Sequence, residues 1–378
     1  MFYKNLIINK HFQGLIKNNI KKNKVPHALL LYGNNGTGKE GHAIELAATL
    51  NCKSKINYEA CGHCHSCIQL KSMQHPNINF ILPYPKRNSI SKNDPPEKTL
   101  NNKDIQELQL LKQNKIKNPY SKFKLNNANT ILINSIRFLK KEIYNTSIES
   151  GWKINIIFEA DKLCNPNQES ANALLKILEE PPNNTIFILI TNKYDNMINT
   201  ITSRCQNFYF RKLSFDLIKN NLNNNTEVNT LKLFIKLYDG NFELIKNNLN
   251  KIDDINEKII QILKYLFYIN QTKFKSFISS IDKSNWDEYM KLFIIILRDL
   301  KVLKSTKIKD SLILQNYLSK YEKIVYKYSD AKFLQCIKSI ERTNNFIFQN
   351  GYFPLLIASL NIEIKRHFNN QINQSFLI

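Results

Sequence analysis

The sequence predicts an α/β fold with a parallel sheet and a phosphate-binding loop, followed by a region made only of helices. A Gly-rich turn at 33–40 lies between an apolar, strand-like run and a helix-like segment, which is the context of a P-loop. Further strand patterns at 152–158 and 185–192 alternate with helical ones, as in a parallel sheet covered on both faces. After about residue 213 the strand signal fades and helical periodicity takes over.

The N-terminal region is predicted to carry a basic amphipathic helix over 5–24. It ends before Val25-Pro26, because proline disfavours a helical conformation in the residue before it. Met1–Lys10 lacks the pattern of a signal peptide, and no apolar run approaches the ~18–20 residues of a membrane span. We therefore expect a cytoplasmic protein with no membrane partner.

Length and charge bound the possible functions. At 378 residues the chain is expected to hold two or three domains. Its net charge of +23, from 54 Lys+Arg and 31 Asp+Glu, is compatible with a nucleic-acid partner. The same chain is rich in Lys, Asn and Ile and holds only 9 Gly, as AT-rich coding would give. We attribute roughly half of the excess to that bias.

The phosphate-binding turn reads Gly33-Asn34-Asn35-Gly36-Thr37-Gly38-Lys39-Glu40. Its glycines let backbone N–H groups point at oxyanions, and the start of the next helix adds partial positive charge. The predicted phosphate-binding residues are Gly33, Gly36, Thr37, Gly38 and Lys39. Glu40 stands where a Ser or Thr hydroxyl would ligate Mg²⁺, and its charge would repel the phosphates.

Four cysteines follow with the spacing C-x8-C-x2-C-x2-C: Cys52, Cys61, Cys64 and Cys67. Four thiolates at such spacing can enclose one tetrahedral Zn²⁺. Unrelated buried thiols or a redox C-x-x-C are the alternatives, and the repeated spacing argues against both. Since the shell leaves no open position, the predicted zinc site, at 52–67, is structural.

Residues 84–128 are Lys/Asn-rich, carry four prolines and show little periodicity apart from a short helix candidate at 105–111. We expect a surface insertion that is partly flexible. A DNA-contacting arm is the less favoured interpretation.

Helical and strand patterns alternate from 130 to 210. A helix begins near 130, and the strand at 152–158 leads to a second helix that starts at Asn165-Pro166, a capping residue followed by proline. That helix runs to Pro181-Pro182, and the next strand ends at Asn192. Short helices at 213–250 and five longer helical patterns at 255–368 then predict a bundle.

Four motifs in this order resemble bacterial clamp-loader subunits of the AAA+ class, related to the gamma/tau and delta-prime subunits of DNA polymerase III. They are the P-loop, the cysteine module, the segment 170–182 (SANALLKILEEPP) and Thr202-Ser203-Arg204-Cys205. The resemblance covers about 27–210. It implies a P-loop AAA+ domain at 1–212, a helical lid at 213–254 and an all-α collar for oligomerisation at 255–378.

The resemblance also implies a function. Such subunits form a five-membered ring that opens a sliding clamp and places it on primed DNA during replication. In the motor subunits ATP binds between neighbours, and the arginine of the Ser-Arg-Cys motif reaches the next subunit's nucleotide. Arg204 matches that arginine, and a guanidinium there would neutralise charge that develops in phosphoryl transfer.

The sequence keeps Lys39 but departs from the motor pattern at three places. Glu40 replaces the Mg²⁺-binding hydroxyl, Phe158-Glu159 replaces an Asp-Glu pair, and Gly240-Asn241-Phe242-Glu243 ends in a carboxylate where motors have an arginine. A phenyl ring cannot ligate Mg²⁺. The three losses are expected to be independent, and together they argue against hydrolysis.

We therefore expect a delta-prime-like, largely non-hydrolysing ring member that contributes Arg204 in trans. Its expected partners are the gamma/tau and delta subunits and, through the complex, the clamp and primed DNA. Structural Zn²⁺ is the expected cofactor, while ATP binding is left open with its absence favoured. A gamma/tau-like ATPase is the first alternative, and a DNA-binding module using the basic surface is the second.

Overall fold

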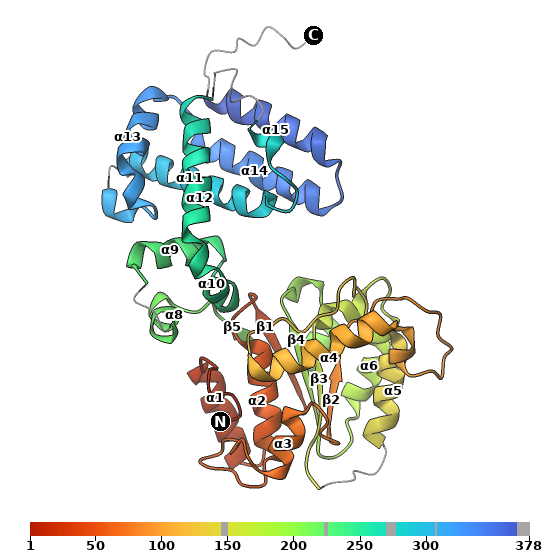
Figure 1. Ribbon diagram of the computed structural model, residues 1–378. Coiled ribbons are helices and arrows are strands. Elements are labelled where there is room, and N and C mark those ends of the chain that lie inside the picture. The colour runs from red at the N-terminus through yellow and green to blue at the C-terminus, as the bar shows by residue number, and fades with distance from the viewer. Residues whose placement is uncertain (145–149, 223–225, 270–276, 307, 369–378) are drawn as a thin grey trace. The chain divides into compact units, whose positions relative to one another are not determined.

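A computed structural model describes residues 1–144, 150–222, 226–269, 277–306 and 308–368. The chain divides into two compact units (Figure 1). The first holds Met1–Leu217 with Asn241–Glu243, and the second holds Ile218–Gly240 with the chain from Leu244 onward. The finer division into a lid at 213–254 and a collar at 255–378 stays a prediction, and the last ten residues of that collar lie outside the described part.

A five-stranded parallel sheet forms the centre of the first unit, as predicted. Its order is β2-β3-β4-β1-β5, and every neighbouring pair runs parallel. All seven residues of β4 are buried, because a parallel sheet with helices on both faces has no solvent-facing side. The strands are β1 (Ala28–Gly33), β2 (Ile78–Ile81), β3 (Lys153–Ile157), β4 (Thr185–Thr191) and β5 (Gln206–Phe210).

Helices cover both faces of this sheet. Apolar residues of α5 and α6 join Leu30, Phe187 and Ile157 in one buried cluster. α2 contacts β1, β3 and β4, and the Phe12 ring of α1 packs on Phe208 at 5.1 Å. The helices are α1 (Lys10–Lys21), α2 (Lys39–Asn51), α3 (His65–Lys71), α4 (Asn102–Lys117), α5 (Ile133–Tyr144), α6 (Glu169–Glu179) and α7 (Asn199–Thr202), while α8 (Phe215–Asn221) spans the boundary between the units.

Two predicted helix starts are wrong. The first helix begins at Lys10 rather than residue 5, because the Asn9 side chain accepts from the Phe12 N–H and caps it there. The helix expected at Asn165-Pro166 begins at Glu169 instead.

The stretch 84–128, expected as a partly flexible surface insertion, holds more regular structure than the short helix candidate at 105–111. α4 is sixteen residues long and is started by a capping box between Asn101 and Asp104. Downstream of it, Phe123 and Leu125 are buried in the first unit, as is Lys115 near the end of α4. Dispersed aromatic and apolar residues anchor this stretch, although it has no regular period.

The second unit is helical throughout its described residues. Tyr265 of α11 donates to the Asn361 side chain of α15 at 2.8 Å, and Trp286 of α12 donates to Asn344 of α14 at 2.9 Å. These polar pairs, the first of them buried, connect neighbouring helices around an apolar core. The helices are α9 (Val228–Leu237), α11 (Ile252–Phe267), α12 (Trp286–Thr306), α13 (Leu318–Lys327), α14 (Phe333–Phe348) and α15 (Phe353–Phe368), while α10 (Phe242–Asn248) again spans the boundary.

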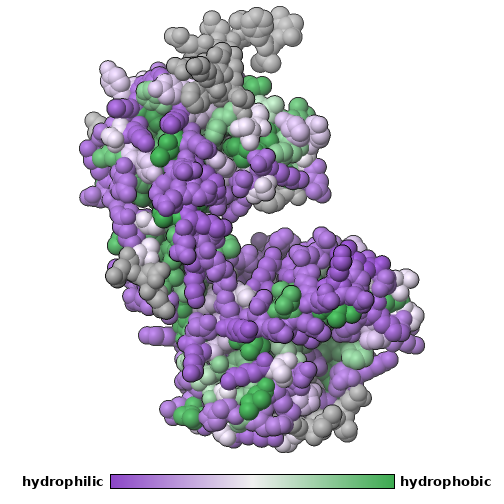
Figure 2. Space-filling model, viewed as in Figure 1, coloured by the Kyte–Doolittle hydropathy of each residue, from purple (hydrophilic) through white to green (hydrophobic). Residues whose placement is uncertain are grey.

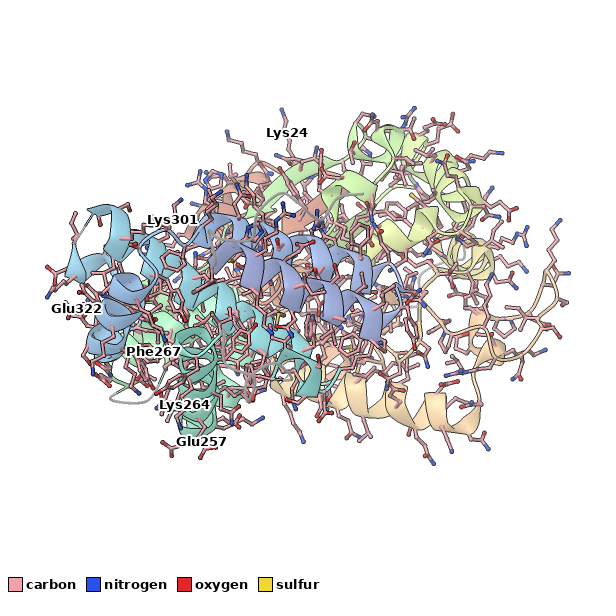
Figure 3. All side chains as sticks on the ribbon, turned by 90° about the horizontal axis from the view of Figure 1, so that it is seen from above. Lys24, Glu257, Lys264, Phe267, Lys301 and Glu322 are labelled. Carbon is pink, nitrogen blue, oxygen red and sulfur yellow. The ribbon has the colours of Figure 1, made fainter. Side chains whose placement is uncertain are left out.

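The outer surface is mainly hydrophilic in the view of Figure 2, with scattered apolar residues. Glu257 and Lys264 of α11 illustrate this, since both are exposed and point away from the helix in Figure 3. None of the described helices combines the length and apolar character that crossing a bilayer requires.

Candidate nucleotide site and metal centre

The predicted P-loop connects β1 to α2 as expected. Gly33, Gly36 and Gly38 all have positive φ. At Gly33 a Cβ atom would lie 2.3 Å from the carbonyl oxygen of Phe210 on β5, so only glycine fits there. The turn therefore has the strand–loop–helix geometry of a phosphate cradle.

Lys39 is turned into this loop. Its Nζ donates to the carbonyl oxygens of Gly33 at 2.8 Å and Asn34 at 2.5 Å, and lies 3.4 Å from the Thr37 hydroxyl. Burial lowers the pKa of Lys39 to about 8, because an ammonium loses solvation there. The loop's own acceptors thus surround the group predicted to reach a phosphate.

His42 of α2 stabilises the base of the loop, and no sequence pattern marks it for this role. Its Nε2 accepts from the Asn9 N–H at 2.9 Å, so the proton is on Nδ1, which donates to the Gly38 carbonyl at 2.8 Å. Burial lowers the pKa of His42 to about 4. The imidazole is therefore neutral near pH 7 and ties the N-terminal segment to the loop.

Glu40 forms an ion pair with Lys115 of α4. The Lys115 side chain is only 1% exposed and also donates to the carbonyl oxygens of Pro119 at 3.0 Å and Ser121 at 2.6 Å. All three Lys115 donors are thereby satisfied. The carboxylate at the Mg²⁺-ligand position is neutralised by a cation of the same chain.

The second departure, Phe158-Glu159, meets the same part of the chain. The Phe158 ring is fully buried and packs edge-on against Phe123 with centroids 4.9 Å apart. Glu159, at φ 46°, forms an ion pair with Lys124 at 2.9 Å. Phe158 is therefore held in an apolar contact, and Glu159 is paired with a second lysine.

The third departure, at Gly240-Asn241-Phe242-Glu243, contacts the same part of the chain. Asn118 donates to the Glu243 carboxylate at 2.6 Å, and the rings of Tyr120 and Phe242 lie 4.8 Å apart. The 115–124 segment, which comprises the end of α4 and the loop after it, thus contacts Glu40, Phe158, Glu159 and Glu243. One segment therefore contacts all three altered positions.

Thr191 ends β4 and donates to the Asp161 carboxylate at 2.7 Å, while its hydroxyl accepts from the Lys193 N–H at 3.0 Å. Thr191 is therefore a hydrogen-bonding residue at the end of the strand.

Arg204 lies on the surface just after α7, and its side chain is 37% exposed. Its guanidinium donates to the Thr200 carbonyl at 2.9 Å and to the Glu179 carboxylate at 2.8 Å. Glu179 ends α6, the helix of the SANALLKILEEPP motif. The structure therefore brings the 170–182 motif and the Ser-Arg-Cys motif into contact.

The four predicted zinc ligands come together. The Sγ atoms of Cys52, Cys61, Cys64 and Cys67 all lie within 4.8 Å of one another, and those of Cys52 and Cys64 are 3.8 Å apart. A tetrahedral Zn²⁺ with Zn–S bonds of about 2.3 Å would place its sulfurs about 3.8 Å apart. His63 and His65 are exposed and lie outside this set.

Backbone N–H groups support the same cluster. The Cys61 N–H donates to the Cys52 sulfur and the Cys64 N–H to the Cys61 sulfur, both at 3.3 Å. Such donors stabilise thiolates and orient them toward a metal. The four-sulfur set fits a structural zinc ion, because four protein ligands leave no coordination position open for water or substrate.

Comparisons with known proteins agree with this geometry. Residues 8–214 match the family model described as "DNA polymerase III, delta subunit". The DNA polymerase III subunit delta' of Bacillus subtilis is 28% identical over 208 residues, covering 55% of this chain and 49% of that protein. The gamma/tau subunit of Mycoplasma genitalium is 27% identical over 231 residues, covering 61% of this chain and 31% of that protein.

The chain thus spans about half the length of the first of these relatives and about a third of the second. A gamma subunit-related protein of Thermotoga maritima aligns over 94% of this chain and 99% of its own, at 14% identity with a TM-score of 0.41. The matched family region contains the sheet, the P-loop, the cysteine cluster and Arg204. The chain belongs to the DNA polymerase III delta subunit family.

Proposed function

We propose that this chain is a delta-prime-like, largely non-hydrolysing subunit of a clamp loader in bacterial DNA replication. It acts in the cytoplasm, within a ring that includes gamma/tau and delta subunits. The ring loads a sliding clamp on primed DNA, and this chain contributes an arginine to a neighbour's ATP site.

The 115–124 segment carries this proposal. Mg²⁺ takes oxygen ligands in near-octahedral geometry, yet Phe158 offers no oxygen and packs on Phe123. The carboxylates of Glu40 and Glu159 are paired with Lys115 and Lys124. For MgATP to bind productively, two ion pairs and an aromatic contact would have to open at once.

The position of Arg204 supports its role in trans. Its partner Glu179 is half-exposed, and surface ion pairs of this kind stabilise a protein by only about 0.2–1 kcal/mol. A neighbouring subunit's triphosphate, with its higher charge, would compete well for the guanidinium. Release of Glu179 would free Arg204 for that contact at small cost.

The other components have structural roles in this proposal. Zn²⁺ bound by Cys52, Cys61, Cys64 and Cys67 stabilises the module at 52–67. The lid at 213–254 and the collar at 255–378 hold the ring together. The Gly-rich loop and Lys39 serve as a folded element rather than as an ATP site.

One observation favours a second candidate, a gamma/tau-like ATPase. The loop keeps its glycines with positive φ, and Lys39 is present as the first residue of α2. A nucleotide that displaced the 115–124 segment would find a formed phosphate cradle.

Reconstitution with a motor subunit, delta, clamp and primed DNA separates the two candidates. We expect Arg204→Ala to lower ATP turnover of the complex by about 10³-fold or more, while Arg211→Ala, a control at another exposed arginine, leaves turnover unchanged. Lys39→Ala is expected to have no effect on turnover. A complex that tolerates Arg204→Ala and fails with Lys39→Ala would overturn the proposed role and favour the ATPase.

A further inference from the structure

Three residues that follow α9 cover the phosphate loop of the first unit. Asn241, Phe242 and Glu243 belong to that unit, whereas the chain on both sides of them belongs to the second. We call these residues the 241–243 plug. We propose that the plug is an intramolecular occupant of the phosphate loop and that its removal exposes a binding site for an inorganic polyphosphate. The inference rests on the proposed function, in which the loop does not act as an ATP site.

The Asn241 side chain lies directly on Gly36, in the middle of the loop. A Cβ atom at Gly36 would be only 2.3 Å from the Oδ1 atom of Asn241 and 2.6 Å from its Cα atom. Gly36 also has a φ of 73°, a left-handed conformation that glycine adopts without strain. Glycine at this position therefore both shapes the loop and leaves the space that Asn241 fills.

Leu6 and the Tyr120 ring extend this cover to the end of the loop. A Cβ atom at Gly38 would be 3.3 Å from both the Cδ1 atom of Leu6 and the Cε1 atom of Tyr120, and both side chains are buried. The Tyr120 hydroxyl accepts a hydrogen bond from the Ile7 N–H at 2.8 Å, which joins the two covering segments. Because an anion loses solvation against apolar groups, these contacts disfavour a phosphate at the covered loop.

The other two residues of the plug are anchored to the 115–124 segment. The Phe242 ring, only 5% exposed, packs against the Tyr120 ring with centroids 4.8 Å apart. The Glu243 carboxylate accepts from the Asn118 side chain at 2.6 Å. An aromatic contact and a hydrogen bond to a carboxylate therefore hold the plug on the loop.

The loop under the plug retains its phosphate-binding groups. The Lys39 Nζ donates to the carbonyl oxygens of Gly33 and Asn34, and the Thr37 hydroxyl donates to the Asn34 carbonyl at 3.0 Å. With a pKa of about 8, Lys39 is cationic at neutral pH. These groups are bonded to the loop itself, so a polyphosphate would exchange contacts with them once the plug is removed.

Inorganic tripolyphosphate without Mg²⁺ is the probe that matches this site. Glu40 and Phe158 stand at the positions expected to ligate Mg²⁺, so binding of a metal-free probe does not depend on them. The charge of Glu40 is compensated by Lys115, which limits repulsion of the probe. Binding then reports on the loop and Lys39.

Isothermal titration calorimetry of the full-length chain with tripolyphosphate tests the plug. The apparent affinity is the intrinsic affinity multiplied by the fraction of molecules that are open. Asn241→Ala/Glu243→Ala removes the amide on the loop and a charge-assisted hydrogen bond, so it should bind the probe about tenfold more tightly than the parent chain. Phe242→Leu keeps a buried apolar side chain but removes the ring contact, and it should gain about fivefold.

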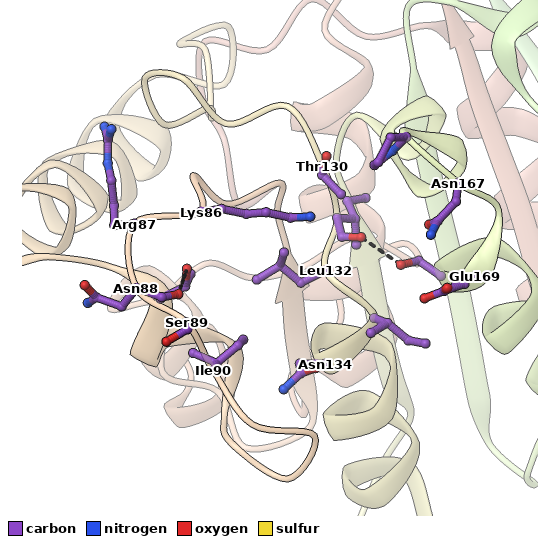
Figure 4. Close-up of a pocket in the computed structure, with 15 residues that line it drawn as sticks. Lys86, Arg87, Asn88, Ser89, Ile90, Thr130, Leu132, Asn134, Asn167 and Glu169 are labelled. Carbon is purple, nitrogen blue, oxygen red and sulfur yellow. Dashed lines mark hydrogen bonds between the residues drawn. The ribbon is translucent and has the colours of Figure 1, made fainter.

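Two lysine substitutions locate the gained binding. In the Asn241→Ala/Glu243→Ala background, Lys39→Ala should abolish the gain. The matched control lies in another basic hollow of the first unit, of about 400 Å³, where Figure 4 shows Lys86 extending from its loop toward Thr130. Lys86→Ala removes the same charge from that hollow and should leave the gain unchanged. Circular dichroism melting checks that the plug variants stay folded.

Three results would overturn the proposal: folded plug variants that bind tripolyphosphate no more tightly than the parent chain, a gain that survives Lys39→Ala, or a gain that Lys86→Ala removes. Failure of the proposed function is distinguishable from these. It would show as MgATP binding by the parent chain that depends on Lys39, whereas the plug is judged by the difference between the variants and the parent.

Discussion

Lys115→Met tests whether the 115–124 segment holds the altered nucleotide site together. The substitution keeps most of the aliphatic stem but removes the ammonium that pairs with Glu40 and donates to two carbonyl oxygens. Removing one partner of a fully buried ion pair costs about 3–5 kcal/mol. The Glu40 side chain is 26% exposed, so water screens part of the loss and we expect about 2–3 kcal/mol.

The two tryptophans allow each unit to be followed in urea. Trp152 precedes β3 in the first unit and exchanges two hydrogen bonds with Asn51, whereas Trp286 lies in the second. In a Trp286→Phe background, fluorescence reports the first unit only. With an m-value of about 2–3 kcal/mol/M, Lys115→Met should lower the urea midpoint by roughly 1 M.

A double-mutant cycle with Glu40→Gln supplies the control. If the two side chains act as a pair, the double variant should lose at least about 1 kcal/mol less than the sum of the single variants. Additive losses, or a Lys115→Met midpoint equal to that of the parent, would refute the assignment of this segment as the partner of Glu40.

Two further predictions use the same tryptophan signal. The pKa of His42 is lowered from 6.5 to about 4, so between these pH values the unfolded chain takes up a proton that the folded chain does not. Stability of the first unit should fall by about 3 kcal/mol as pH drops from 6.5 to 4; an equal slope in His42→Gln would contradict this origin. The purified chain should hold one zinc ion, and Cys64→Ser should lose it and shift the Trp152 transition, while Cys164→Ser should do neither. Equal metal content and stability in all three proteins would remove the zinc assignment.

The strands and most helices could be predicted because their signals are local. β1 and β4 are mainly apolar runs, and β3 is apolar apart from Lys153 and Asn155; such runs are typical of buried parallel strands. The cysteine cluster could also be predicted from the sequence, since its x2 spacings alone imply that the sulfurs converge. The grouping of the four sulfurs is confirmed, and zinc itself stays a prediction.

The 115–124 segment could not be predicted because its contacts are distant in sequence. Lys115 meets Glu40 across 75 residues, and Asn118 meets Glu243 across 125. In the sequence, Lys115 and Lys124 are two lysines among many in a Lys/Asn-rich stretch. Nothing local marks Lys115 as buried, and Phe158 looks only like a lost ligand until Phe123 is found against it.

Helix starts failed for a related reason. Asn165-Pro166 has the residue types of a helix N-terminus, yet α6 begins three residues later at Glu169. Asn165 instead donates to the Asn129 carbonyl at 3.2 Å, which binds it to the preceding connection. Capping preference gave a plausible start, and a tertiary contact decided against it.

Titration of the full-length chain with labelled ATP, with and without Mg²⁺, tests the central claim most directly. The ion pairs of Glu40 and Glu159 with the 115–124 segment predict that Mg²⁺ adds no affinity, and that Lys39→Ala leaves any residual binding unchanged. Tight ATP binding that requires Mg²⁺ and is abolished by Lys39→Ala would contradict the claim that this site no longer binds Mg²⁺.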